Sequence, residues 1–516
     1  MTDDVASDGS RDLSALTSWR SEWVGLRVAV LGLGVTGFSV ADTLIELGAD
    51  VLVVAAQASD EHRELLNLIG ASFVQADDEV PAALAGFGAE LVVVSPGYPP
   101  RHPFLAWAVE QNLEVWGDIE LAWRLRDKVV RSDGAPADWV CITGTNGKTT
   151  TTQLTATMLV AGGVRAAPAG NIGVPVLDAI RDPQGFDVLV LELSSHQLHW
   201  VNRNAGGVLA PLASVCLNLA DDHLEWHGSR DEYRGAKAKV YDNVRLACVY
   251  NLADVATREM VEDATVQDGC RAIGFGLGVP GPSDLGLVDG ILVDRAFLEE
   301  RRTSALELAT LADLHPAGLD SPHMTANVLA AAALARAVGI EPAAIRDAVR
   351  GFRVDHHRTE VVGEKAGITW VDDSKATNAH AADAALSGFT NVVWIAGGLL
   401  KGIDPAPLVS KHAARLRAAV LIGADRSALR EAFQRHAPGV TVLEVDGDET
   451  GGVMTAAVRA AASVARSGDV VLLAPAAASF DQFTDYAQRG ARFAEAVHAY
   501  LEGADRDDDP TSRSET

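Results

Sequence analysis

A glycine-rich turn carries the residues of this sequence that are best suited to chemistry on a phosphate. The apolar run Val140 to Ile142 leads into Gly144-Thr-Asn-Gly-Lys-Thr149, and a segment able to start a helix follows. Backbone N–H groups of such a turn can contact phosphate oxygens, a lysine adds a point charge, and a threonine can ligate Mg²⁺. Ile142 stands where the common G-x-x-x-x-G-K pattern has its first glycine. The motif is therefore a variant that must be judged with its neighbours, and a lysine that merely starts a helix is the alternative.

An acid and three basic residues supply such neighbours. The run DVLVLEL, residues 187–193, is strand-like and reaches Glu192 near its end, at the sheet edge where the phosphate turn is also expected. A carboxylate buried there costs several kcal/mol unless it meets a cation, which a metal ion would supply; a solvent-facing acid is the alternative. His223 could be a metal ligand, and Lys237 or Lys239 could react if a desolvated, cationic site lowered its pKa. Taken alone, these three fit ordinary surface residues better.

A second glycine pattern, Gly32-x-Gly34-x-x-Gly37, follows the strand-like run RVAVL and opens a helix. This context favours a backbone cradle for a pyrophosphate at a helix N-terminus. The next strand-like run, VLVVAAQAS, ends without the acid that would bind a ribose hydroxyl in an NAD site. The pattern therefore indicates a nucleotide diphosphate held by its phosphates rather than NAD, with a plain tight turn as the alternative.

Three polar segments near the C-terminus each follow a strand-like run. They are VDDSKATN at 371–378, GGLLKG at 397–402 and LLAPAAASFDQF at 472–483. Because the carboxyl ends of parallel strands share one edge of a sheet, we expect the three segments to meet there. Lysines at that edge suit an anionic substrate, and the small residues and Ser479 allow close backbone approach. Any one segment could be an ordinary loop, but their joint placement favours a binding site.

Short β-branched runs that alternate with Ala/Leu-rich stretches must position these segments, and this alternation predicts parallel α/β sheets with crossover helices. The expected strands lie at 27–32, 51–55, 90–97, 139–144, 187–193, 213–219, 247–252, 368–374, 392–398, 418–424 and 469–475. Their grouping, with polar composition at both ends, predicts a disordered tail at 1–22, domains at 23–126, 127–353 and 354–501, and a second tail at 502–516. The Gly/Pro-rich stretch 276–322 is expected to be a peripheral addition.

Composition excludes several classes of partner. Lys and Arg number 43 against 70 Asp and Glu, and the net charge of −27 repels nucleic acid and anionic lipid. The four cysteines form no C-x-x-C pair and fit buried thiols. The acidic N-terminus lacks the features of a signal peptide, and no apolar run approaches the roughly 18 residues of a membrane span. We expect a cytoplasmic protein without membrane insertion.

Ten motifs, taken in their order along the chain, resemble those of the Mur ligases of peptidoglycan synthesis. They are SPG, TGTNGKT, GNIG, LELSSHQ, DDH, AK, HR, DDSKATN, GG-x-x-KG and AAASFDQF, and the resemblance runs from about residue 26 to 500. The last three are closest to the branch of the family that adds D-glutamate. The D-N-P-R signature expected of the branch that adds diaminopimelate is absent from the sequence.

The resemblance implies an α/β fold of three domains: an N-terminal Rossmann-like domain for the UDP end of a substrate, a central P-loop ATPase, and a C-terminal Rossmann-like domain for an amino acid. It implies that ATP phosphorylates the carboxylate of UDP-N-acetylmuramoyl-L-alanine and that the amine of D-glutamate attacks the acyl phosphate. Two Mg²⁺ ions, a CO₂-derived carbamate on a lysine and a monomeric chain are also expected.

The resemblance assigns roles to individual residues. Catalytic roles fall to Lys148, His223 and Lys237, with Lys237 carbamylated, and Mg²⁺ contacts fall to Thr149, Glu192, His223 and Lys237. Contacts to ATP fall to Gly144, Thr145, Asn146, Gly147, Lys148, Thr149, Thr150, Asn327, Arg358 and Asp373. Contacts to the UDP-sugar substrate fall to Gly34, Val35, Thr36, Ser95, Asn171, Ser195, His196 and Gln197. The D-glutamate pocket draws on Lys375, Thr377, Lys401, Ser479, Phe480 and Tyr486.

The sequence departs from the family pattern in places. Leu400 stands where an acid commonly precedes the lysine of GG-x-x-KG, Met324 replaces an asparagine and Tyr486 a phenylalanine. The segment AAQASDEHR does not carry the family's acid and arginine for uracil at the expected place. Three rival functions remain: an ATP-dependent ligase for another amino acid, including the folylpolyglutamate synthetase type; a P-loop regulatory ATPase or kinase; and an NAD-dependent oxidoreductase. The second leaves DDSKATN and AAASFDQF without a role, and the third lacks its strand-end acid.

Overall fold

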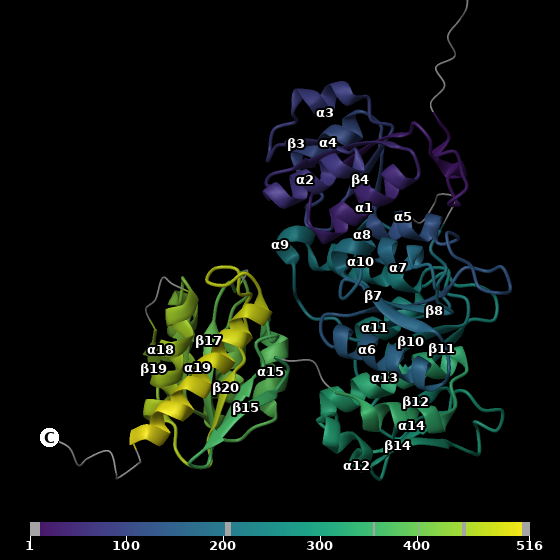
Figure 1. The fold of residues 1–516 in the computed structure, drawn as a ribbon. Coiled ribbons are helices and arrows are strands. Elements are labelled where there is room, and N and C mark those ends of the chain that lie inside the picture. Colours follow the sequence, from purple (N-terminus) through teal and green to yellow (C-terminus); the bar gives the residue numbers. More distant parts are fainter. Residues whose placement is uncertain (1–10, 202–207, 354–356, 401, 446–449, 508–516) are drawn as a thin grey trace, which may run out of the picture. The chain divides into compact units, whose positions relative to one another are not determined.

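The computed structural model describes residues 11–201, 208–353, 357–400, 402–445 and 450–507. These residues form three β-sheets and the helices that connect their strands. Contacts divide the chain into two compact units, Met1–Phe352 with two of the sheets and Arg353–Thr516 with the third (Figure 1). Each of the eleven runs expected to be strands coincides with a strand. The expected α/β architecture is confirmed.

The first sheet is fully parallel, with the strand order β3-β2-β1-β4-β5. Its strands are β1 Arg27–Leu31, β2 Asp50–Ala55, β3 Ser72–Gln75, β4 Leu91–Val94 and β5 Glu114–Gly117. Its helices are α1 Val35–Glu46, α2 Asp60–Ile69, α3 Ala82–Phe87, α4 Pro103–Glu110 and α5 Asp118–Leu125. Helix α1 starts close against β1 because Gly37 has no side chain; a Cβ atom there would lie 2.1 Å from the carbonyl oxygen of Gly32.

The expected disorder of residues 1–22 is wrong for residues 11–22. A short 3₁₀ helix, η1 Leu13–Ala15, lies in this stretch, and the side chains of Leu13 and Leu16 join the core. The carbonyl oxygens of both residues accept hydrogen bonds from the buried guanidinium of Arg124, which needs acceptors because it is removed from water. At the other end, residues 502–507 extend helix α19, Tyr486–Asp507, where a disordered tail was expected.

The central sheet has nine strands in the order β14-β13-β12-β11-β10-β9-β6-β8-β7. They are β6 Asp138–Thr143, β7 Ala166–Gly170, β8 Val188–Glu192, β9 Ala213–Cys216, β10 Ala247–Asn251, β11 Arg271–Phe275, β12 Asp284–Val288, β13 Ile291–Asp294 and β14 Leu306–Thr310. The stretch 276–322 supplies β12, which is parallel to β11, and then β13 and β14, which continue the sheet's edge in antiparallel pairings. The strands from β7 to β11 are parallel, so their carboxyl ends share one edge.

Helices connect the central strands, and some pack against the first sheet's domain. They are α6 Lys148–Ala161, α7 Val176–Arg181, α8 Ser195–His199, α9 Leu224–His227, α10 Arg230–Ala238, α11 Val255–Glu262, α12 Leu311–Leu314, α13 Pro322–Val338 and α14 Pro342–Gly351, with 3₁₀ turns η2 Lys239–Tyr241 and η3 His315–Ala317. Helix α7 meets α1 through Ser39 and Asp178, whose side-chain oxygens lie 2.6 Å apart. Among the described helices, none has the length and apolar character needed to cross a membrane.

The second unit contains one six-stranded sheet in the order β15-β16-β20-β17-β18-β19, with only β15 antiparallel to its neighbour. Its strands are β15 Glu360–Lys365, β16 Ile368–Asp372, β17 Val392–Gly397, β18 Leu416–Ile422, β19 Thr441–Glu444 and β20 Val470–Leu473. Its other helices are α15 Ala379–Ser387, α16 Ala406–His412, η4 Ala413–Arg415, α17 Ser427–His436 and α18 Thr450–Val464. The loops after β16, β17 and β20 leave the same edge, as the sequence predicted.

Candidate active site

The phosphate turn lies between β6 and α6, where the sequence placed it. Gly144 (φ 149°) and Gly147 (φ 86°) adopt backbone conformations that favour glycine. Asn218 holds the turn, because its backbone oxygen accepts from the N–H of Thr145 and its side-chain oxygen accepts from the N–H of Asn146. The first N–H groups of α6 have no carbonyl partner inside the helix, so the turn can bind an anion there.

Lys148 curls back over this turn. Its Nζ atom donates to the carbonyl oxygens of Gly144 and Thr145, both at 2.9 Å. Asn327 of α13 packs on the other side, and a Cβ atom on Gly147 would lie 2.5 Å from its side-chain oxygen. Met324, one of the departures from the family pattern, has its sulfur 3.9 Å from the Asn327 amide nitrogen. The residues expected to contact ATP in this unit are therefore gathered around one turn.

Glu192 ends β8 directly beside β6, paired in register with Ile142. Its side chain is buried, and Oε1 accepts a hydrogen bond from the Asn171 amide at 3.0 Å. Oε2 is buried and accepts no hydrogen bond from any residue that the structure describes. A buried carboxylate with an oxygen left over is costly unless a cation is added, and hard divalent cations prefer oxygen ligands. The site therefore fits Mg²⁺.

Lys237, from α10, is fully buried, and its Nζ donates to the Gly144 carbonyl oxygen at 2.8 Å. Desolvation, followed by the nearby charge of Lys148, lowers the pKa of Lys237 to about 7. Glu192 and Asp222 act in the opposite direction but are the smaller influences. With this pKa, a substantial fraction of the Lys237 side chain is neutral near neutral pH. The neutral amine is the form that can react with CO₂. The surface interpretation of Lys237 is wrong.

His223 precedes α9 with a left-handed backbone (φ 54°). Its N–H donates to Asp222 Oδ1 at 2.9 Å, and its ring meets the ring of His196 edge-on at 4.5 Å between centroids. The sequence singled out His223 in the motif DDH but did not predict its hydrogen bond to Asp222. Tyr233 was also missed, although its hydroxyl lies 3.0 Å from Thr145 Oγ1 and so ties α10 to the phosphate turn.

The residues expected to contact the UDP-sugar substrate occupy three places, one of which is Asn171, directly after β7 and beside Glu192. Gly34, Val35 and Thr36 begin α1, and Ser95 follows β4. Ser195, His196 and Gln197 begin α8. A Cβ atom on Gly32 would lie 2.7 Å from Ser95 Oγ. Ser95 therefore packs tightly against the turn formed by Gly32 to Gly37.

Two of the α8 residues point into the protein. Ser195 Oγ lies 3.0 Å from Nε2 of His227, and Gln197 donates to Asp118 Oδ2 at 2.9 Å. Burial lowers the pKa of His227 to about 3 and raises that of Asp118 to about 6. No pattern in the sequence signalled Asp118, because it acts through a contact between distant segments.

The C-terminal motifs meet at one sheet edge in the second unit. Leu399 and Ala478 exchange two backbone hydrogen bonds, which join the loop after β17 to the loop after β20. Lys375 Nζ lies 4.9 Å from the centre of the Tyr486 ring. Thr377 follows β16, and Ser479 is buried whereas Phe480 is exposed. Lys401 lies outside the described residues.

A buried arginine that the sequence did not signal ties two of these loops together. Arg489 of α19 donates to the backbone oxygens of Ser374 and Ala477, at 2.8 and 3.1 Å, and to Ser374 Oγ at 3.0 Å. Burial lowers the pKa of Arg489 to about 10. Arg358 and Asp373, expected to contact ATP, belong to the same unit, and burial raises the pKa of Asp373 to about 7 against the opposing charge of Arg358.

A glycine-rich turn before a helix, a buried acid that fits Mg²⁺ and three α/β sheets are typical of enzymes that bind phosphate groups, and comparisons with known proteins identify the family. Three family domains match in order: "Mur ligase MurD-like, N-terminal domain" over 26–117, "Mur ligase middle domain" over 142–335, and "Mur ligase, glutamate ligase domain" over 357–477. The chain belongs to the Mur ligase family, whose members use ATP and Mg²⁺ to form amide bonds in peptidoglycan precursor synthesis.

Individual relatives indicate which branch of the family the chain resembles. The chain is 65% identical over 505 residues to the UDP-N-acetylmuramoylalanine--D-glutamate ligase of Leifsonia xyli subsp. xyli, covering 97% of this chain and 98% of the relative. It is 51% identical over 485 residues to the ligase of that name from Streptomyces avermitilis, covering 92% and 99%. The solved UDP-N-acetylmuramate-alanine ligase of Thermotoga maritima shares the fold, with a TM-score of 0.54 at 18% identity over 92% of this chain and 99% of that one.

Proposed function

We propose that this protein joins D-glutamate to UDP-N-acetylmuramoyl-L-alanine through an acyl phosphate made with ATP. The observation that carries the proposal is that Lys148 and Lys237 both donate to the Gly144 carbonyl oxygen, while Glu192 ends the neighbouring strand with one buried oxygen that accepts no hydrogen bond from the described residues. These groups suit the roles of a phosphate-binding cation, a reactive amine and a ligand for Mg²⁺. The two relatives with the D-glutamate ligase name, at 65% and 51% identity, support the choice of substrates.

Mg²⁺ is proposed to be held by Glu192 and Thr149 at one position, and by His223 and carbamylated Lys237 at a second. The ions would neutralise the negative charge that builds up when a carboxylate approaches a polyphosphate. The carbamate forms when the neutral Lys237 amine attacks CO₂ and loses a proton, which turns a cation into an anionic ligand. The lowered pKa of Lys237 supports this step because it supplies the neutral amine.

The remaining residues of this unit are proposed to bind and orient. Lys148 and the first N–H groups of α6 would hold the γ-phosphate while it passes to the substrate carboxylate, with Asn327 beside the turn. The UDP end is assigned to the start of α1 and to Ser95, and the sugar to Asn171, Ser195, His196 and Gln197. Because Ser195 and Gln197 are buried, they would act mainly by shaping α8.

In the second unit, Arg358 and Asp373 are proposed to contact the nucleotide, and the loop edge is proposed to bind D-glutamate. That pocket is assigned to Lys375, Thr377, Lys401, Ser479, Phe480 and Tyr486. The proximity of Lys375 to Tyr486 and the joined loops after β17 and β20 support the assignment. We further propose that the enzyme acts in the cytoplasm as a monomer.

An amino-acid panel tests the proposal. Purified protein with ATP, Mg²⁺ and UDP-N-acetylmuramoyl-L-alanine should release phosphate with D-glutamate and far more slowly with L-glutamate, L-alanine, lysine or diaminopimelate. Mass spectrometry should find one new amide product. Preference for another amino acid would contradict the substrate assignment, and phosphate release without an amide would favour a regulatory ATPase. Elongation of a folate substrate would favour the folylpolyglutamate synthetase type.

A further inference from the structure

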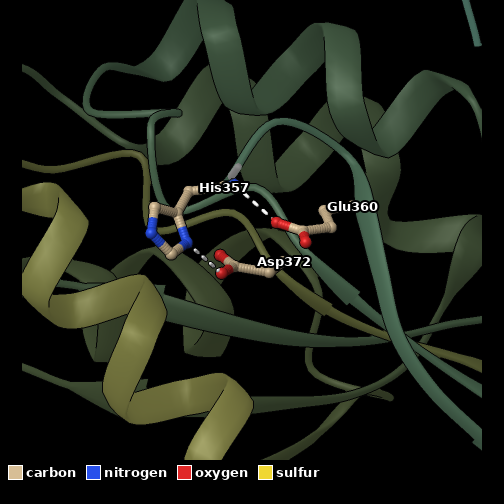
Figure 2. A group of neighbouring side chains, drawn as sticks. All are labelled: His357, Glu360 and Asp372. Carbon is tan, nitrogen blue, oxygen red and sulfur yellow. Dashed lines mark hydrogen bonds and ion pairs between the residues drawn. The ribbon is translucent and has the colours of Figure 1, made fainter. Parts of the chain in front are cut away.

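The side chains of His357, Glu360 and Asp372 lie close together in the second unit. Figure 2 shows the imidazole of His357 directed at the carboxylate of Asp372, with Nδ1 and Oδ2 2.6 Å apart. The backbone N–H of His357 donates to Glu360 Oε2 at 2.8 Å. Asp372 is fully buried and the imidazole only 17% exposed. We call His357 and Asp372 the histidine clasp.

The clasp joins two segments that each carry a residue assigned to ATP. Arg358 follows His357, and Asp373 follows Asp372. Two further hydrogen bonds complete the connection. The Thr359 N–H donates to the side-chain oxygen Oδ1 of Asp373 at 3.2 Å, and the Lys375 N–H donates to the His357 carbonyl oxygen at 3.2 Å. Any movement at the clasp would therefore be passed to both nucleotide contacts.

The backbone around Arg358 is held in an unfavourable form. His357 (φ 67°) and Thr359 (φ 47°) both lie in the left-handed region that residues with a side chain avoid. Such conformations persist only where surrounding contacts impose them, and they concentrate at functional sites. The clasp and the bond from Thr359 to Asp373 are the contacts that impose them on either side of Arg358.

Helix α19 leaves a space that fits the clasp closely. A Cβ atom on Gly490 would lie 2.2 Å from His357 Nδ1 and 2.7 Å from Asp372 Oδ2, directly beside their hydrogen bond. Any larger residue at 490 would force the imidazole and the carboxylate apart. The hydrogen bond between His357 and Asp372 therefore depends on a glycine at position 490.

We propose that His357 and Asp372 are positioning residues that fix Arg358 and Asp373 for nucleotide binding. The inference rests on the proposed function, which assigns Arg358 and Asp373 to ATP. His357, Glu360 and Asp372 also form the one group in the described ranges whose His and carboxylate atoms are close enough to hold a metal ion, all within 4.8 Å. The clasp is favoured because Nδ1 and Oδ2 already hydrogen-bond each other directly, and an ion would have to break that bond.

Calorimetric titration of the full-length protein with Mg-ADP tests the proposal without depending on turnover. His357→Ala and Gly490→Ala should both weaken ADP binding about tenfold, because either change opens the clasp. Gly503→Ala is the matched control in the same helix, since nothing lies within 4 Å of a Cβ atom there; it should leave ADP affinity unchanged. His357→Asn should recover part of the affinity, because its amide can donate to Asp372.

Two further variants separate failure of the clasp from failure of the proposed function. Arg358→Ala and Asp373→Asn should each weaken ADP binding. If they do so while folded His357→Ala and Gly490→Ala bind as tightly as the parent, the clasp is wrong and the nucleotide assignment stands. If neither pair changes the affinity, the nucleotide assignment itself fails and the clasp with it. Binding stoichiometry and thermal melting report the folded fraction of each variant. If the parent protein binds Zn²⁺ or Mn²⁺ tightly and His357→Ala does not, these residues form a metal site and the clasp is wrong.

Discussion

Lys148 and Lys237 share one acceptor: both ammonium groups donate to the carbonyl oxygen of Gly144, at 2.9 and 2.8 Å. Two like charges so close to one oxygen repel each other, and this repulsion adds to burial in lowering the pKa of Lys237. An anion placed between the two lysines would relieve the repulsion. This arrangement supports the proposal that Lys148 binds phosphate and that Lys237 becomes a carbamate.

Lys148→Ala should lower turnover by at least about 10², because a positioned charge that acts on a transferring phosphoryl group is worth a few kcal/mol in the transition state. Steady-state phosphate release with saturating substrates measures it. Lys411→Ala is the control, since Lys411 is an exposed helix residue paired with Asp383, and it should retain full turnover. Near-normal turnover in Lys148→Ala would remove the role assigned to this lysine.

Lys237→Ala should be inactive and should regain part of its turnover when acetate or another small carboxylate is added, because the carboxylate can take the place of the carbamate. Lys237→Arg should also be inactive but should show no such rescue, since the guanidinium keeps its charge and fills the space. Turnover is measured against carboxylate concentration for each variant. Full activity of Lys237→Ala without additives would contradict the assignment.

Glu192→Gln should separate metal binding from stability. Turnover should fall about 10²-fold and the Mg²⁺ concentration for half-maximal activity should rise, because a neutral amide is a poor ligand for a hard cation. In metal-free buffer, however, the free energy of unfolding should stay level or increase by about 1 kcal/mol, since the variant removes a buried charge. A large loss of stability without metal would show that the charge of Glu192 stabilises the fold, for example through nearby Lys237, because glutamine keeps an oxygen that can accept from Asn171.

Asp118 predicts a specific dependence of stability on pH. Burial raises its pKa to about 6 in the folded protein, above the value of about 3.9 in an unfolded chain. The folded state therefore holds the proton more tightly, so this group's contribution to stability is fully present below about pH 4 and is lost as pH rises through 6. Asp118→Asn should remove that loss and raise the free energy of unfolding at pH 7 by about 1–3 kcal/mol.

Denaturant unfolding at pH 4, 5, 6 and 7 measures this contribution. The asparagine keeps an oxygen that can accept from Gln197, so the contact with α8 is retained. Asp50→Asn, at an exposed position at the start of β2, is the matched control and should follow the parent at every pH. An equal stability difference between Asp118→Asn and the parent at pH 4 and pH 7 would contradict the prediction.

The elements were predictable because their signals are local. Apolar runs such as 139–144 and 187–193 are buried on both faces in parallel sheets, and glycines at 144 and 147 mark the turn that follows. Motif order then placed Lys148 and Glu192 on neighbouring strands. The lowered pKa of Lys237 could be suggested from sequence but not judged, because burial against the Gly144 carbonyl depends on how α10 packs.

The remaining residues depend on contacts between distant segments. Asp118 acts through Gln197, and Arg489 acts through Ser374 and Ala477, so neither has a local pattern to reveal it. Residues 11–22 look like a polar tail in composition, yet Leu13 and Leu16 supply the acceptors that buried Arg124 requires. In each case the partner lies far along the chain.

Arg489→Lys should raise the KM for D-glutamate about tenfold or more and change the KM for ATP less. The planar guanidinium bonds to both loops at the proposed amino-acid pocket, whereas a lysine offers one point charge and cannot reach both. Initial rates with each substrate varied in turn measure the two constants. Arg492→Lys is the control, because Arg492 lies in the same helix with a largely exposed partner, Glu495. Equal increases in both KM values would indicate general loosening of the second unit rather than a role in arranging the D-glutamate pocket.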